Sequence, residues 1–176
     1  MRPGGARELP LARADDVGEL EEVLGVLAAA FLDETLEQML VAFAVKEPKV
    51  RQLFSGLSFK ARTDLAYALG LIGDIERNDL DVIRGVRNQF AHKVRGLSFD
   101  RQSIASRCRQ LRSLSEISFR VPSDTAEPMR FRFVTAVVVI ASTLRARLAR
   151  LRHREKPEPL RDIEVRLRGG PPHRPA

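Results

Sequence analysis

The residues best placed to do chemistry lie in one helical stretch, residues 79–92, which ends in RNQFAH. His92 is the only histidine in such a setting, because His153 lies in an arginine run and His173 near the proline-rich end. A histidine can transfer protons near neutral pH. On a regular helix Asn88 and His92 share a polar side of the stretch. This polar side is the first candidate for function.

Arg87 falls on the other, apolar side of the same stretch. That side carries residues that recur at helical spacing and predict a buried face: Leu80, Ile83, Phe90 and Val94. A buried arginine without a partner costs several kcal/mol, so Arg87 needs a carboxylate. Asp64 lies at the edge of the apolar face of the preceding predicted helix. We therefore expect a buried Asp64–Arg87 ion pair, with Asp33 or Glu34 as a possible third member.

The spacing from Arg87 to His92 resembles the arginine–four residues–histidine pattern of the HEPN superfamily. Many HEPN proteins are helical-bundle ribonucleases in which the arginine and the histidine of two protomers meet. The resemblance implies Arg87 as a cation near the scissile phosphate and His92 for proton transfer, with Asn88 beside them. Within one helix Arg87 and His92 lie about 140° apart, so such a site needs a break in the helix or a second subunit. The alternative is that Arg87 pairs with a core carboxylate and His92 is a surface or helix-end residue.

Four blocks of sequence resemble, in order and spacing, the mannitol operon repressor family: residues 30–34, 59–72, 81–92 and 97–100. The agreement covers about residues 24–112, and residues 131–148 are compatible with the last helix of that family. The resemblance implies an all-α fold and a role in transcriptional repression. That family lacks an obvious helix-turn-helix and none is found here, so action through a protein partner, DNA or both is implied.

A run of arginines near the C-terminal end is the best candidate for nucleic-acid contact: Arg145, Arg147, Arg150, Arg152 and Arg154. On a helix that continues to residue 154, Arg147, Arg150 and Arg154 share one side and can neutralise phosphates. The alternative is a solvated helix end, where the helix dipole favours cations.

Length and composition fit one globular domain, with 176 residues, 44% hydrophobic residues and a formal net charge of +7. This charge allows contact with nucleic acid or another acidic partner. Cys108 is the single cysteine, which excludes an intrachain disulfide, and we expect it in the core rather than as a nucleophile. We find no signal segment and no apolar run long enough to cross a bilayer. We therefore expect a soluble cytoplasmic protein without metal or cofactor.

The predicted fold class is all-α, a single helical bundle of about five main helices over residues 15–154. Residues 1–14 and 155–176 are expected to be flexible ends. Helices are predicted over about residues 15–46, 59–72, 75–95, 101–114 and 129–154, with Ser58, Asp74 and Asp100 as their caps and Gly73 and Gly96 as stops. Residues 48–57 are predicted as a turn-rich connection and residues 115–128 as a linker.

The first of these helices is apolar on two sides. One side carries Leu20, Leu24, Leu27, Phe31, Met39 and Phe43, and the second carries Val26, Leu36 and Leu40. A helix that is apolar on two sides is expected to be packed on two sides, at the centre of the bundle.

The expected function is a non-enzymatic transcriptional regulator of the mannitol repressor type. The alternative is a HEPN-like endoribonuclease or toxin–antitoxin component that uses Arg87 and His92 across a dimer. A third possibility is a dimeric interaction module with neither activity. We favour a protein without ribonuclease activity, because Arg87 is expected to be used by the fold.

Overall fold

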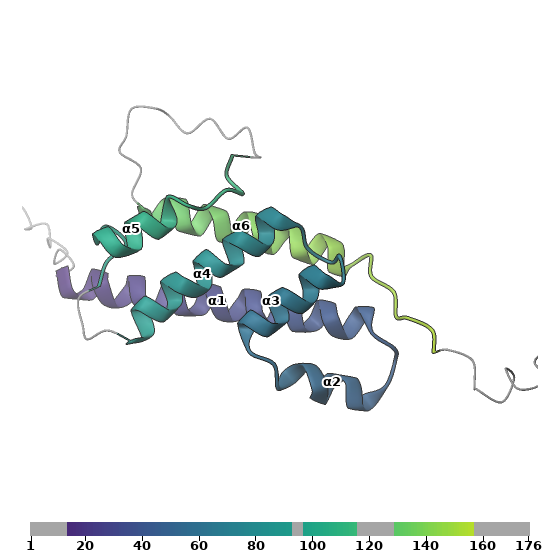
Figure 1. Cartoon of the computed structure of the whole chain (residues 1–176). Coiled ribbons are helices and arrows are strands. Elements are labelled where there is room, and N and C mark those ends of the chain that lie inside the picture. Colours follow the sequence, from purple (N-terminus) through teal and green to yellow (C-terminus); the bar gives the residue numbers. More distant parts are fainter. Residues whose placement is uncertain (1–13, 93–96, 116–128, 157–176) are drawn as a thin grey trace, which may run out of the picture.

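A computed structural model of the chain describes residues 14–92, 97–115 and 129–156. These residues form six α-helices (Figure 1): α1 (Ala14–Phe43), α2 (Pro48–Ser55), α3 (Phe59–Ala68), α4 (Asp74–His92), α5 (Gln102–Cys108) and α6 (Met129–Leu148). The predicted all-α fold is confirmed. None of the described helices combines the length and hydropathy that a membrane span requires. Residues 1–13, most of the predicted linker and residues 157–176 lie outside the described part.

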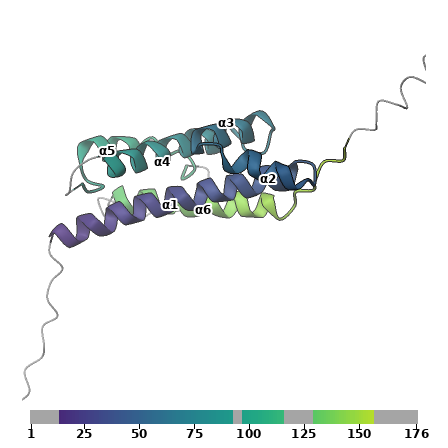
Figure 2. The same cartoon turned by 90° about the horizontal axis from the view of Figure 1, so that it is seen from below.

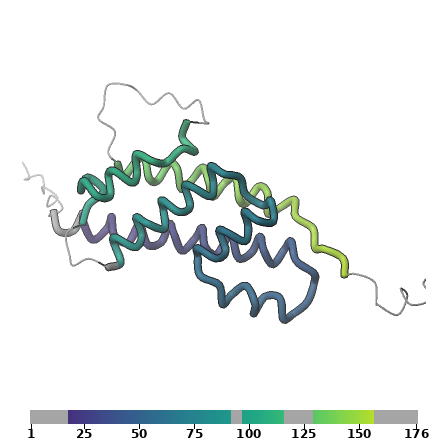
Figure 3. Tube along the Cα trace, in the orientation of Figure 1, coloured from purple at the N-terminus to yellow at the C-terminus, as the bar shows by residue number. Residues whose placement is uncertain are grey.

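The helices form two layers (Figure 2). α1 and α6 lie side by side, and α3, α4 and α5 cover one face of this pair. α1 and α6 run in the same direction (Figure 3). The segments that follow them meet in a parallel bridge between Val45 and Arg154, which agrees with this direction.

The core lies between the two layers. Its largest fully buried side chains include Leu32, Leu36, Met39 and Leu40 of α1, Leu80, Ile83 and Phe90 of α4, and Phe133 and Ile140 of α6. The buried face predicted for Leu80, Ile83 and Phe90 is therefore confirmed. The ring of Phe99 lies 5.2 Å from that of Phe90 and 4.9 Å from that of Phe133, measured between centroids, so aromatic contacts join α4 to α6.

α1 packs against α2, α3, α4 and α6, so its central position is confirmed. Leu36 and Leu40 of the second predicted side are buried, but much of the first predicted side is not covered by the described residues. Leu20 is 67% exposed, Leu27 is 62% exposed and Phe31 is 42% exposed, whereas Met39 of the same predicted face is buried. The described part of the chain therefore packs only one side of this half of the helix.

The predicted turn-rich connection over residues 48–57 is wrong, because Pro48 begins α2. Proline is favoured in the first turn of a helix, where its missing N–H has no partner to lose. The cap of α3 is confirmed, since the hydroxyl of Ser58 accepts the N–H of Ala61 at 3.2 Å. α3 ends at Ala68, before the predicted stop, and Gly70 then takes a φ of +69° that suits glycine.

Three other predicted helix boundaries need correction. At the start of α4 the side chain of Glu76, not Asp74, accepts the N–H of Gly73, at 2.7 Å. α5 begins after Arg101, which makes no side-chain cap bond. α6 ends at Leu148 rather than at residue 154, because the chain then runs along the end of α1. There the N–H of Arg154 donates to the carbonyl oxygens of Phe43 and Ala44, which α1 itself leaves without partners.

Candidate functional site

An open pocket of about 450 Å³ lies where α1, α3 and α4 meet. Its lining, which we call the cationic pocket, consists of Val26, Ala29, Ala30, Asp33, Ser58, Phe59, Lys60, Arg84, Arg87 and Asn88. Three of these residues are cations, and several others are apolar. Such a lining suits an anionic group attached to a small apolar body.

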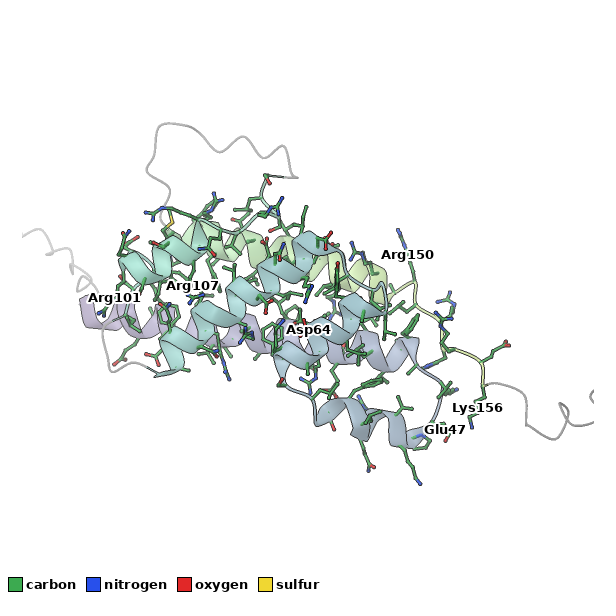
Figure 4. All side chains as sticks on the ribbon, in the orientation of Figure 1. Glu47, Asp64, Arg101, Arg107, Arg150 and Lys156 are labelled. Atoms are coloured by element: carbon green, nitrogen blue, oxygen red, sulfur yellow. The ribbon has the colours of Figure 1, made fainter. Side chains whose placement is uncertain are left out.

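A ladder of side-chain contacts fixes α3 against α4 and sets the position of Lys60. Its rungs join Tyr67 to Asp74 (2.7 Å), Asp64 to Arg77 (3.1 Å) and Lys60 to Asp81 (3.3 Å). The rungs show that the two helices are antiparallel, and Figure 4 shows Asp64 at their junction.

The electrostatics of this ladder keep Lys60 charged. The ammonium of Lys60 also donates to Asp64 at 2.7 Å. This hydrogen bond is the main cause that raises the pKa of Lys60 and lowers the pKa of Asp64. Both side chains therefore carry their charges at neutral pH.

The predicted Asp64–Arg87 ion pair is wrong. Arg87 is exposed, and its guanidinium donates to the side-chain oxygen of Asn88 at 3.1 Å. The ladder gives the reason, because α3 begins at Phe59 and its first rung reaches only Asp81 of α4. Arg87 lies more than one helical turn beyond Asp81. At that point α4 no longer contacts α3 and lines the cationic pocket instead.

The buried arginine of this region is Arg62, which is 7% exposed. Its guanidinium contacts Asp33 at 2.6 Å and Glu37 at 2.8 Å. It also donates to the carbonyl oxygens of Phe54 and Ser55, at 3.2 and 3.0 Å. Arg62 therefore ties α1, the end of α2 and α3 together.

Asp33 thus binds a buried arginine, but one from α3 rather than Arg87 of α4. Glu34, the other predicted partner, is exposed and accepts from Gln38. The sequence contains a signal for Arg62, since Asp33 and Glu37 lie one turn apart on an α1 that has no basic residue. Two carboxylates facing the core need a cation from another element.

α4 continues without a break as far as His92, its last residue. Arg87 and Asn88 lie together on the cationic pocket, whereas the side chain of His92 is outside the described part. The helix therefore offers no break that brings residue 92 toward Arg87.

The arginine run does not form one helical side, so that part of the prediction is wrong. Arg147 contacts Glu76 at 2.5 Å and donates to the carbonyl oxygen of Leu71 at 3.1 Å. Arg154 lies beyond α6, with its guanidinium 4.5 Å from the ring centroid of Phe43. Arg145, Arg150 and Arg152 are exposed, and Figure 4 shows Arg150 projecting away from the helices. Arg154 is exposed as well, and the side chain of Arg147 is 40% exposed, so contact with nucleic acid stays a prediction for all five arginines.

Two other chemistry-bearing side chains serve the fold. Cys108 is buried, and its desolvation raises the pKa of the thiol to about 11, so it stays protonated. Asp79 is also buried and accepts the N–H groups of Arg112 and Ser113, at 2.9 and 2.8 Å. In the described ranges, no three histidine, cysteine or carboxylate side chains gather to hold a metal.

No protein-family model, curated protein or solved structure matches this chain. The resemblances to mannitol operon repressors and to HEPN proteins therefore stay predictions.

Sequence reasoning singled out Arg87 and Asn88 of the cationic pocket but missed Lys60 and Arg84. Arg84 shares Asp81 with Lys60, through contacts of 3.4 and 3.3 Å. In the sequence, Lys60 and Arg84 look like ordinary cations on the surfaces of two separate helices. Only the antiparallel ladder brings them to one opening.

Proposed function

We propose that this protein is a non-enzymatic regulator of the transcriptional-repressor type, which holds an anionic group in the cationic pocket. One observation carries the proposal. Three of the four blocks that resemble mannitol operon repressors, residues 30–34, 59–72 and 81–92, supply most of the lining of this one pocket. Blocks far apart in sequence thus converge on a single opening, as expected where a family keeps a shared binding site.

The side chains described in the pocket favour binding over catalysis. Asp33, the only carboxylate among the lining residues, is engaged by Arg62. Lys60 is held in its charged form by Asp64. A group that is to accept a proton must be free to do so near neutral pH. The lining therefore supplies positive charge for an anion and no described general base.

The helix arrangement favours regulation through a partner over groove reading by a helix. α2 and α3 follow one another across a short turn, but α3 packs against both α1 and α4. A recognition helix must present one side to the major groove. On the outer side of α3, Lys60 and Asp64 are engaged with Asp81 and Arg77 of α4, so we expect any DNA contact to involve other surfaces, such as that of Arg145, Arg150 and Arg152.

The double variant Arg84→Ala/Arg87→Ala is expected to abolish regulation without unfolding the protein. Each lost charge-assisted contact to an anion weakens binding by about 1.5–3 kcal/mol, or at least tenfold. The measurement is repression of promoter fusions for the protein's own gene and its neighbours in a deletion strain complemented with each form. Arg51→Ala, which removes an exposed arginine of α2 outside the cationic pocket and the arginine run, is the control and should repress like wild type. No response of any fusion to the deletion, or full repression by the double variant, contradicts the proposal.

A HEPN-like endoribonuclease is the second candidate, and one observation favours it. Arg87 is not used by the fold, as the sequence suggested, but is exposed beside Asn88 on the cationic pocket. An exposed arginine can reach a phosphate of RNA. This removes one reason for expecting no ribonuclease activity, although the unbroken α4 still separates Arg87 from residue 92.

Purified protein is expected to leave a mixed RNA substrate intact, because regulation by binding needs no cleavage. The assay compares wild type with Arg87→Ala and His92→Ala. General acid–base catalysis contributes about 10²–10⁴-fold to a rate, so a true activity would collapse in His92→Ala. Cleavage by wild type that both variants lose would promote the second candidate over the first.

A further inference from the structure

The face of the α1/α6 layer that α3, α4 and α5 leave open is strongly apolar. Eight large apolar side chains are exposed in the described residues, and six of them belong to these two helices: Leu20, Val23, Leu27 and Phe31 of α1, and Phe131 and Val138 of α6. The other two, Leu53 and Leu69, stand singly on other elements. We propose that a second copy of this chain docks on this open face, so that two α1/α6 layers pack against each other.

The six side chains form two apolar stripes, one on α1 and one on α6, which lie at the same end of the α1/α6 layer. Those of α1 follow at steps of three and four residues, and those of α6 are two turns apart, so each set lies on one side of its helix. Because α1 and α6 run in the same direction, the apolar part of each lies toward the same end of the layer. Half-buried apolar residues pack on the core at the edges of the stripes, among them Leu24 and Ala28 of α1 and Val134 and Val137 of α6.

The pocket and the open face occupy different sides of α1. Val26, Ala30 and Asp33 line the cationic pocket and mark the side of α1 that faces α3 and α4. On a regular helix Leu24 and Ala28 lie on the opposite flank of the exposed stripe. The stripe and the pocket therefore lie on different sides of α1, and a copy docked on the stripe would leave the pocket open.

Charge identifies the occupant. α1 has no basic residue and exposes the carboxylates of Glu19 and Glu34, whereas α6 has no acidic residue and exposes Arg130 and Arg145. A partner that fits must be apolar in the middle, basic opposite α1 and acidic opposite α6. A second copy meets this condition, because a two-fold axis along the helices sets α1 of each copy against α6 of the other. The same axis keeps the two apolar stripes at one level.

Other surfaces fit this face less well. An anionic membrane and a nucleic acid both attract basic residues and repel carboxylates, and the α1 half of the face is acidic. The size also suits a dimer. Two helices side by side over the length of α6 present a projected area of about 600 Å², and a ridged helical surface buries more than its projection. Stable dimers bury about 800 Å² on each partner.

The test is the mass of the full chain in solution, measured by light scattering on a sizing column across a concentration series. Wild type is expected at about twice 19.8 kDa. Leu27→Glu and Val138→Glu each place a carboxylate in the middle of the apolar face and should reduce the mass to that of one chain. Leu53→Glu is the matched control, because Leu53 of α2 is 65% exposed and Leu27 is 62% exposed. It should leave the dimer intact.

Circular dichroism and the melting temperature show whether each variant is folded; Leu27 and Val138 are both exposed in one copy, so a folded monomer is expected. A wild-type protein that stays monomeric throughout the concentration series overturns the proposal. So does a dimer that survives both Leu27→Glu and Val138→Glu, or one that is lost equally in Leu53→Glu. None of these results bears on the cationic pocket, so dimerisation and regulation are tested separately.

Discussion

Arg62→Met is expected to lower the free energy of unfolding by about 3–5 kcal/mol, because it leaves buried charges without their partner. Arg62 is 7% exposed and binds Asp33, Glu37 and two carbonyl oxygens at once. Methionine fills similar space but makes none of these bonds. Asp33 and Glu37 keep some contact with water, since their side chains are 28% and 23% exposed, which favours the lower end of this range. Urea denaturation measures the change.

Lys60→Met is the matched control for this experiment. Lys60 lies on the same helix and also contacts two carboxylates, but its side chain is 39% exposed. Exposed ion pairs contribute about 0–1 kcal/mol, so only a small change is expected. Adding Asp33→Asn and Glu37→Gln to Arg62→Met should restore part of the loss by removing the unpaired charges. An Arg62→Met protein within about 1 kcal/mol of wild type would show that Arg62 is not a structural anchor.

Gly25→Ala is expected to destabilise the protein by about 1–3 kcal/mol, the usual range for an overpacked core. A methyl group at Gly25 of α1 would lie 2.7 Å from a ring carbon of Phe90. Phe90 is 1% exposed and is held against Phe99, so it has no room to move. The close approach of α1 to α4 therefore requires glycine here. Alanine is otherwise favoured over glycine within a helix by about 1 kcal/mol, and the clash must exceed this gain.

Gly85→Ala separates the clash from helix propensity. A methyl group at Gly85 of α4 would also meet an atom at 2.7 Å, but that atom is the terminal nitrogen of Arg107, which Figure 4 shows on α5. A flexible side chain can swing away. We expect Gly85→Ala to be neutral or stabilising by up to about 1 kcal/mol. Equal melting temperatures for the two variants would contradict the tight α1–α4 contact.

Local signals in the sequence were sufficient for much of the fold. Apolar spacing places Leu80, Ile83 and Phe90 in the core, and Ser58 caps α3 as predicted. Pro48 shows where such signals are ambiguous, because proline both ends one helix and begins another. The early end of α6 depends on Arg154 finding free carbonyl groups at the end of α1, which no local pattern contains.

The candidate site was predicted only in part, and Arg87 shows why. Helical periodicity assigns a side to each residue but cannot say how far the neighbouring helix extends along that side. Leu80 is fully buried, whereas Arg87, two turns later on the same side of α4, is exposed on the pocket beyond the last contact with α3 at Asp81. Lys60 and Arg84 reach the pocket through the pairing of α3 with α4. The spacing of residues along one helix does not encode that pairing.

The pairing of α1 with α6 has a consequence for synthesis on the ribosome. Eighty-five residues separate the end of α1 at Phe43 from the start of α6 at Met129. At about 5–20 residues per second, the nascent α1 waits roughly 4–17 seconds for its neighbour. During that interval the flank of α1 that α6 will cover is exposed beside the apolar stripe that no described helix covers. The emerging chain therefore presents its most aggregation-prone surface early, and we expect it to be a client of ribosome-associated chaperones until α6 emerges.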